Sequence, residues 1–192
     1  MKQSVTALLC LLGALLLGAV PVPLAAQQAG LPPELKLPLL IKVLSFDRGL
    51  ESRANDVVVA IVYQRQVPSS IRERDIWLDS AGAPLELRGA RVRVVAIDYR
   101  GTDELISSLR DARATVVFLS SLRAVDVSTV AERVRVAGFR TATDAPAVAG
   151  RAASIGLLLR SGRPHIVINM PLAMREGSDF SSQLLRVAEV VK

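Results

Sequence analysis

Hydrophobic residues fall in short runs along the chain, and these runs alternate with segments of helical spacing. Residues 57–63 form a continuous β-branched apolar run. Such a run is typical of a strand buried on both faces, so it predicts a central parallel strand. Shorter runs at 115–119 and 139–143 predict two more strands. In residues 91–97 arginines alternate with valines, which predicts an edge strand with one face in solvent.

The segments between these strands have apolar residues at helical spacing. Two prolines begin a helix over residues 32–46, and serines lie at the start of a second helix over 68–78. Thr102 caps a third helix, and residues 127–136 form a fourth that ends at Gly138. Strands that alternate with helices in this way predict βαβ units and a parallel sheet.

From residue 152 onward the pattern changes. Residues 155–159 and 165–168 are apolar and flank a Ser-Gly pair, which predicts an antiparallel hairpin. A final amphipathic helix is predicted after the hairpin. Its apolar stripe consists of Phe180, Leu184, Val187, Ala188 and Val191. The pattern as a whole predicts an α/β fold in a single domain, with a mixed sheet of about six strands flanked by helices.

Residues 1–26 have the organisation of a cleavable signal peptide. A lysine at position 2 is followed by the uncharged apolar residues 5–20, and then by prolines and small residues. The alternative, an uncleaved membrane anchor, needs roughly 20 apolar residues, and this run is shorter. We expect cleavage after Ala26, a mature domain of residues 27–192 and export to the periplasm. Because the only cysteine, Cys10, would leave with the signal, the mature domain would have no disulfide.

The chain is basic, with a formal net charge of +6 and basic residues, mostly arginines, spread over the chain. Aromatic residues make up 4% of the sequence, which leaves few side chains for base stacking. An exported protein also rarely meets nucleic acid, so we expect no nucleic-acid partner. The basic residues are interpreted as a solvated surface that would suit an acidic partner or an anionic lipid.

No motif indicates a catalytic or cofactor site. The sequence contains neither the dinucleotide pattern GxGxxG, nor the phosphate-binding GxxxxGK[ST], nor the hydrolase pattern GxSxG. The single histidine, His165, cannot form a zinc site without partners and is interpreted as a strand residue. Asp98, Asp103 and Glu104 lie close together in the sequence, but a strand end and a helix first turn explain them better than a catalytic pair does. We expect no cofactor and no enzymatic activity.

A small ligand is an alternative function, because ligands of open α/β sheets lie beyond the carboxyl ends of the parallel strands. The polar residues expected at those ends are Asp98, Ser120, Ser121, Thr143 and Asp144. Ordinary turn and capping chemistry explains the same residues without a ligand, and we favour that interpretation.

Residues 149–191 carry an ordered set of features: a Gly-Arg pair, an apolar strand that ends in Ile-Asn, a short alanine-containing helix, a glycine, and Ser-Ser-x-Leu-Leu. The positions that define it are Gly162, Arg163, Ile168, Asn169, Ala173, Gly177, Ser181, Ser182, Leu184, Leu185 and Ala188. This combination resembles the C-terminal signature of the YfiR-type family of periplasmic regulatory proteins. We interpret these residues as mainly structural: Asn169 can cap the short helix, Gly177 permits a reversal, and Ser178 or Asp179 can cap the final helix.

The resemblance implies a periplasmic regulator that acts by binding. The best-known member of the family holds the periplasmic sensor domain of an inner-membrane diguanylate cyclase inactive, and so links envelope conditions to cyclic di-GMP and biofilm formation. For this chain the implied partner is such a cyclase or a sensor kinase, and a homodimer stays open. The contact surface would be the last helix or the edge that carries Arg91 and Arg93. Redox sensing by disulfides, which the best-known member uses, is excluded here if Cys10 leaves with the signal.

Overall fold

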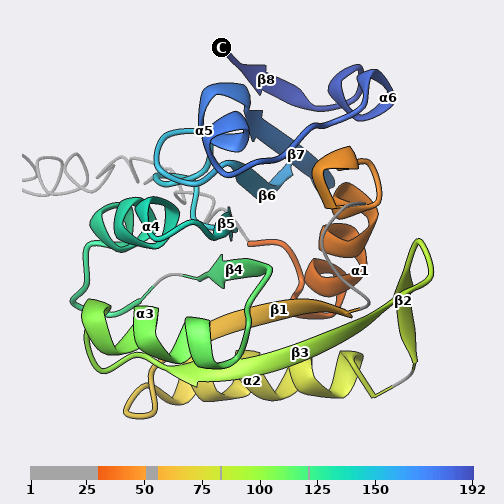
Figure 1. The fold of residues 1–192 in the computed structure, drawn as a ribbon. Helices are drawn as coiled ribbons and strands as arrows, with labels where there is room; N and C mark the ends of the chain where they lie inside the picture. Colours follow the sequence, from red (N-terminus) through yellow and green to blue (C-terminus); the bar gives the residue numbers. More distant parts are fainter. Residues whose placement is uncertain (1–29, 51–55, 83, 121) are drawn as a thin grey trace, which may run out of the picture.

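A single mixed β-sheet with helices on both faces forms the protein (Figure 1). The computed structural model describes residues 30–50, 56–82, 84–120 and 122–192, so the expected signal peptide lies outside the described residues. The strands are β1 (Asp56–Tyr63), β2 (Leu85–Leu87), β3 (Ala90–Asp98), β4 (Val116–Leu119), β5 (Arg140–Thr143), β6 (Ile155–Arg160), β7 (Arg163–Asn169) and β8 (Glu189–Val191). The helices are α1 (Pro33–Leu44), a 3-10 turn η1 (Arg48–Leu50), α2 (Pro68–Ser80), α3 (Thr102–Asp111), α4 (Val127–Val136), α5 (Met170–Arg175) and α6 (Ser182–Leu185).

The strand order in the sheet is β2-β3-β1-β4-β5-β6-β7-β8. β3, β1, β4, β5 and β6 run parallel to one another, whereas β2 pairs antiparallel with β3 and β7 pairs antiparallel with β6. β1 lies between two parallel strands, with Val59 facing Val94 on one side and Val116 on the other. The prediction of a central parallel strand at residues 57–63 is therefore confirmed, as is the antiparallel hairpin.

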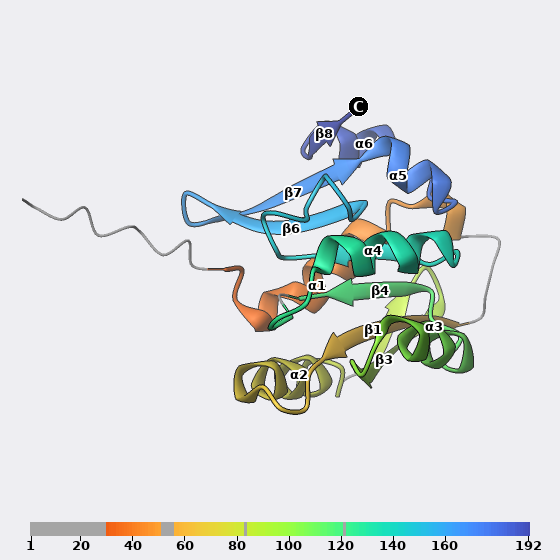
Figure 2. The same cartoon turned by 90° about the vertical axis from the view of Figure 1, so that its left-hand side faces the viewer.

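Helices bury an apolar layer against each face of the sheet. α1 and α2 cover one face, where the Trp77 and Phe118 rings lie 4.6 Å apart between centroids and Leu40 is fully buried. α3 and α4 cover the other face over Leu109 and Val134 (Figures 1 and 2). No helix in the described ranges is long and apolar enough to cross a membrane.

The sheet is larger than the pattern predicts, with eight strands among the described residues instead of about six. The additional strands, β2 and β8, have three residues each, too short to give an alternating pattern. β2 pairs with residues 90–92, so the expectation that residues 91–97 form an edge strand is wrong at the start of β3. The first helix also ends at Leu44, two residues earlier than the pattern predicts.

The final amphipathic helix is the main error in the expected fold. α6 ends at Leu185, and residues 189–191 instead form β8, parallel to β7. The β-branched residues Val190 and Val191 favour a strand, and pairing with β7 satisfies backbone groups that would otherwise face solvent. Val187, expected on the buried stripe, is consequently exposed. Tertiary pairing has overridden the helical spacing here.

Candidate functional site

The carboxyl ends of β4 and β5 bring two of the expected ligand residues together. Ser120 directly follows β4 and Asp144 directly follows β5, and these two strands are adjacent and parallel. Lys36 of α1 and Glu73 of α2 reach the same place. We call these four residues the Lys36 cluster.

The Lys36 cluster is held by direct contacts between oppositely charged groups. The Lys36 ammonium contacts the Glu73 carboxylate and lies 2.5 Å from Asp144 Oδ2. Ser120 Oγ donates a hydrogen bond of 2.8 Å to Glu73 Oε1. The Lys36 side chain is only 5% exposed, and its Nζ also lies 6.0 Å from the centroid of the Phe118 ring. The cluster therefore joins α1, α2 and the carboxyl edge of the sheet.

The charges in this cluster favour a structural role over a chemical one. Burial alone would lower the pKa of Lys36, but the Asp144 and Glu73 carboxylates beside it outweigh burial and raise that pKa above its usual value. Burial raises the pKa of Asp144, against the opposing effect of Lys36. A lysine that stays protonated is not a nucleophile, and its charge is already matched by two carboxyl groups. The cluster therefore acts as an ion-paired clamp.

Beside the Lys36 cluster there is little space for a ligand. The cavity beside Glu73 and Ser120 has a volume of about 10 Å³, which is the room for one water molecule. Lys36 and Glu73 lie on helices whose packing the local pattern does not fix, so neither residue was predicted to lie at this site. The sequence did contain one indication that Lys36 is buried. Lys36 lies four residues before Leu40 and so shares the inward face of α1 with it.

The other residues expected to bind a ligand serve local structure or lie elsewhere. Thr143 Oγ1 donates to the Leu119 carbonyl at 2.6 Å and accepts from the Ala145 amide, which is the capping role that we favoured. Asp98 accepts from the Arg65 amide at 3.0 Å and is not among the groups that contact Lys36. Ser121 lies outside the described residues.

The remaining polar candidates form surface pairs. Asp103 lies 2.8 Å from Arg133 at the exposed start of α3, and Glu104 lies 3.4 Å from Arg100, so these two carboxylates do not form a catalytic pair. His165 is a half-buried residue of β7, as expected, with its Nε2 2.9 Å from Glu189. The described part of the chain contains no group of three histidine, cysteine or carboxylate residues that would hold a metal ion.

The first half of the C-terminal signature builds a hairpin and a capped helix. Ser161 and Gly162 have φ angles of 51° and 74°, so both central residues of the turn are left-handed, as a two-residue hairpin requires. Arg163 begins β7 on the exposed side of this turn, and Ile168 is fully buried near its end. Asn169 Oδ1 accepts from the Leu172 amide at 2.9 Å, and so caps α5 as expected.

The second half of the signature differs from expectation in its caps. Gly177 has a φ of 76°, which fits the expected reversal, but Ser178 does not cap a helix, since its hydroxyl accepts from Arg140 Nε. The N-cap of α6 is Ser181, whose amide donates to the Phe46 carbonyl. Asp179 pairs instead with an arginine. The last four signature residues follow this cap: Ser182 begins α6, Leu184 is buried in the core, and Leu185 and Ala188 are partly buried against it.

A buried arginine connects the signature to the rest of the protein. Arg140 of β5 is 2% exposed, and its Nε lies 2.9 Å from Asp47 Oδ2. Its Nη2 donates to the Gly177 carbonyl at 2.9 Å. The interpretation of the basic residues as a solvated surface is therefore wrong at Arg140, because a buried carboxylate and two oxygens of the signature region replace water around its guanidinium.

Solved structures share this fold at low sequence identity. They include a conserved domain protein from Vibrio cholerae O1 biovar El Tor, with a TM-score of 0.59 and 15% identity over 84% of this chain. A ligand-free, open substrate-binding protein with adhesive properties from Clostridium difficile has a TM-score of 0.51 at 12% identity over 71% of this chain. An ABC domain in complex with L-Trp from Streptococcus pneumonia has a TM-score of 0.55 at 13% identity over 83% of this chain.

This chain spans 60%, 54% and 60% of the lengths of those three structures, respectively. Their similarity is to the fold alone. No curated protein matches the sequence significantly.

A family model identifies the chain more specifically. The model described as YfiR/HmsC-like matches residues 77–189, which extends upstream of the signature over the end of α2, the strands β2 to β5 except β1, and the helices α3 and α4, and does not include β1. This match confirms the resemblance that the C-terminal signature indicated. The protein belongs to the YfiR/HmsC-like family, whose members are generally periplasmic regulatory proteins.

Proposed function

We propose that this protein is a non-catalytic periplasmic regulator that binds, and represses, the periplasmic sensor domain of an inner-membrane signalling protein. A diguanylate cyclase, and with it control of cyclic di-GMP and biofilm formation, is the first candidate partner, and a sensor kinase is the second. Membership of the YfiR/HmsC-like family is the observation that carries this proposal. The ion-paired state of the Lys36 cluster also favours binding over catalysis.

The surface best suited to such a partner is the β8 edge of the sheet together with α5 and α6, which we call the C-terminal surface. Met174 on α5 is 68% exposed and Val187 after α6 is 74% exposed, and both lie within the matched family region. β8 is the last strand of the sheet, so one row of its backbone groups has no neighbouring strand among the described residues (Figure 1). Exposed apolar side chains beside an open strand edge are typical of protein-binding surfaces.

Arg91 and Arg93 provide the alternative contact surface. They lie near β2, at the opposite edge of the sheet from β8, and both are exposed. Arg93 is paired with Asp56 at 3.8 Å, a distance at which an exposed ion pair contributes little. The two surfaces are far enough apart in the sheet order for separate substitutions to distinguish them.

The test is a crosslinking pull-down of the tagged protein from its native envelope, with mass spectrometry of the captured proteins. We expect an inner-membrane cyclase or kinase with a periplasmic domain. A Val187→Glu variant should lose about tenfold of this capture or more, because it places a charge in the apolar contact. Val136→Glu is the matched control, since Val136 is also 74% exposed but lies on α4.

Three other outcomes are informative. Capture without any membrane protein would contradict the regulator proposal. Equal capture by the Val187 and Val136 variants would rule out the C-terminal surface as the contact site. If Arg93→Glu alone then lost capture, the contact would be assigned to the surface of β3 that carries Arg91 and Arg93.

A further inference from the structure

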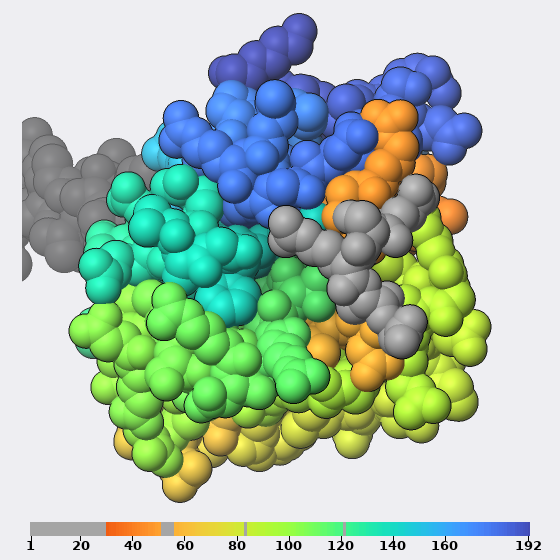
Figure 3. Space-filling model, in the orientation of Figure 1, coloured from red at the N-terminus to blue at the C-terminus, as the bar shows by residue number. Residues whose placement is uncertain are grey.

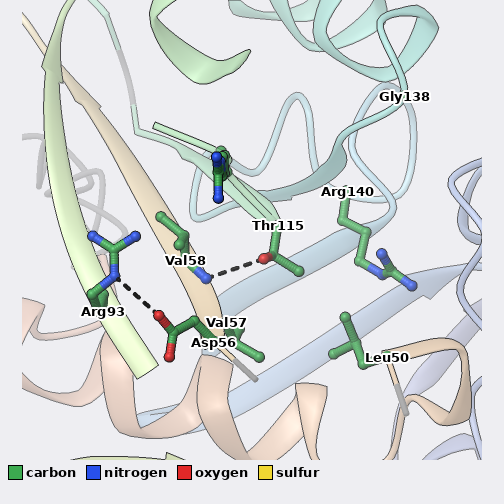
Figure 4. Close-up of a pocket in the computed structure, with 10 residues that line it drawn as sticks. Leu50, Asp56, Val57, Val58, Arg93, Thr115, Gly138 and Arg140 are labelled. Atoms are coloured by element: carbon green, nitrogen blue, oxygen red, sulfur yellow. Dashed lines mark hydrogen bonds and ion pairs between the residues drawn. The ribbon is translucent and has the colours of Figure 1, made fainter. Parts of the chain in front are cut away.

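A cavity of about 460 Å³ lies at the amino ends of β1, β4 and β5, at the opposite edge of the sheet from the Lys36 cluster. This volume is within the range of small-molecule sites, roughly 300 to 1,000 Å³. Figure 4 shows Arg93 and Arg140 on its two sides, with Thr115 and Val58 between them. The cavity lies away from the surface proposed above at β8, but it shares Arg93 with the alternative contact surface on β3.

Arginine side chains predominate among the charged residues that line this cavity. Arg93, Arg113 and Arg140 line it, and among its described lining residues the one carboxylate is Asp56, which lies 3.8 Å from Arg93. The Arg113 guanidinium has no hydrogen bond or ion pair with any described residue. Arg140 is held by Asp47 through its Nε, yet its Nη1 has no partner in the described part of the chain. Arginine groups with unused donors are suited to the oxygen atoms of an anion.

A hydroxyl donor lies among these cations. Thr115 Oγ1 accepts a hydrogen bond of 3.1 Å from the Val58 amide, as Figure 4 shows. Because the amide supplies the hydrogen of this contact, the hydrogen of the Thr115 hydroxyl is available to a ligand oxygen. The cavity therefore combines charged and neutral donors in its lining.

The left-handed backbone at Arg113 does not call for an arginine side chain, so the turn alone does not explain why a charged residue lies there. Arg113 follows the end of α3 with a φ of 54°, a left-handed conformation that costs a side chain about 1 kcal/mol. Gly138 lines the same cavity after α4 with a φ of 92°, and glycine completes that turn without a charge. A cation near the end of α3 interacts favourably with the helix dipole, but this does not explain Arg93, which comes from β3.

We infer that this cavity binds a small oxyanion, a carboxylate or phosphate group on a compact metabolite, with Arg93, Arg113 and Thr115 as its donors. The inference adds a ligand site to the proposed regulator and does not depend on the identity of its protein partner.

The experiment is a titration of the purified protein with inorganic phosphate and with citrate, at constant ionic strength, followed by NMR of the backbone amides. We expect saturable shifts at Ala114, Thr115 and Gly138. The Arg113→Gly variant should weaken the Kd by about tenfold or more. Its Tm should stay equal or rise, because glycine adopts the left-handed backbone without strain, so lost binding would not reflect unfolding.

Arg110→Gln provides the matched control. It removes one exposed positive charge from the last turn of α3 without touching the cavity, so its Kd should stay within about twofold of the wild type. Equal weakening in both variants would mean general electrostatic attraction and would overturn the site. An unchanged Kd in Arg113→Gly, or no saturable shift with either probe, would also overturn it.

Discussion

At the scale of single residues, Glu176 is a carboxyl group held away from water. It is 3% exposed at the end of α5, and burial raises its pKa to about 7 even though hydrogen bonds from Ser154 and Thr141 act in the other direction. The geometry is consistent with a bound proton. Ser154 Oγ lies 2.9 Å from the Thr141 carbonyl and 2.5 Å from Glu176 Oε2, but a hydroxyl has only one hydrogen. If Ser154 donates to the carbonyl, the protonated Glu176 supplies the other hydrogen.

This geometry predicts a stability that falls as the pH rises. The folded pKa of about 7 lies above the ordinary value of 4.5, so the stabilisation is fully present below pH 4.5 and is lost as the pH rises through 7. Between about pH 5 and about pH 8 the free energy of unfolding should fall by about 2 kcal/mol from this group. Urea unfolding at several pH values measures it. Glu176→Gln should remove this slope whatever its overall stability, and an unchanged slope would show that Glu176 does not titrate in this range.

At the scale of elements, a strand or helix is predictable where its local pattern has a single physical cause. Residues 57–63 must be apolar throughout because β1 has neighbours on both sides and helices on both faces, so their strand was predictable. Residues 180–191 have a helical spacing, but residues 189–191 pair with the open edge of β7 and form β8. A pattern within one segment contains no information about an unpaired edge formed elsewhere.

The residues of the candidate site also divide into those that were predictable from the sequence and those that were not. Ser120 and Asp144 were predictable neighbours, because the ends of adjacent parallel strands meet. Lys36 and Glu73 were not, since helix packing brings them to that edge. The arginines of the amino-edge cavity come from two strands and a turn, and no sequence spacing relates them.

The cap of α5 gives a prediction at this scale. Asn169 Oδ1 caps the helix at Leu172, while its Nδ2 donates to the Gly150 carbonyl at 2.8 Å. Asn169→Ala loses both bonds and should cost about 2 kcal/mol in the free energy of unfolding. Asn169→Ser keeps a capping oxygen and should cost about half of that. Urea unfolding compares the two, and an alanine variant as stable as the wild type would show that neither bond matters.

At the scale of the whole molecule, one buried ion pair joins the start, middle and end of the chain. Asp47 follows α1, and its carboxylate accepts from Arg140 of β5 and from the Asp179 amide, at 2.9 and 2.7 Å. Figure 3 shows the segment after α1 beside the C-terminal segment on the surface. Gly49 is required at this junction, because a Cβ there would lie 2.2 Å from the Gly177 carbonyl oxygen. The family signature is thus packed onto the first helix through a polar contact that excludes water.

Removal of one partner from this pair should destabilise the entire fold. Arg140→Met leaves the Asp47 carboxylate buried without its cation, which should cost about 3 to 5 kcal/mol in the free energy of unfolding. Adding Asp47→Asn should recover part of the loss, since the buried uncompensated charge causes most of it. Arg133→Met is the control, because Arg133 and Asp103 also lie 2.8 Å apart but are exposed, so its cost should be below about 1 kcal/mol. Urea unfolding monitored at Trp77 measures all three variants. Equal costs for the Arg140 and Arg133 variants would mean that water reaches the Asp47 carboxylate, and that apolar packing alone holds the first helix to the signature.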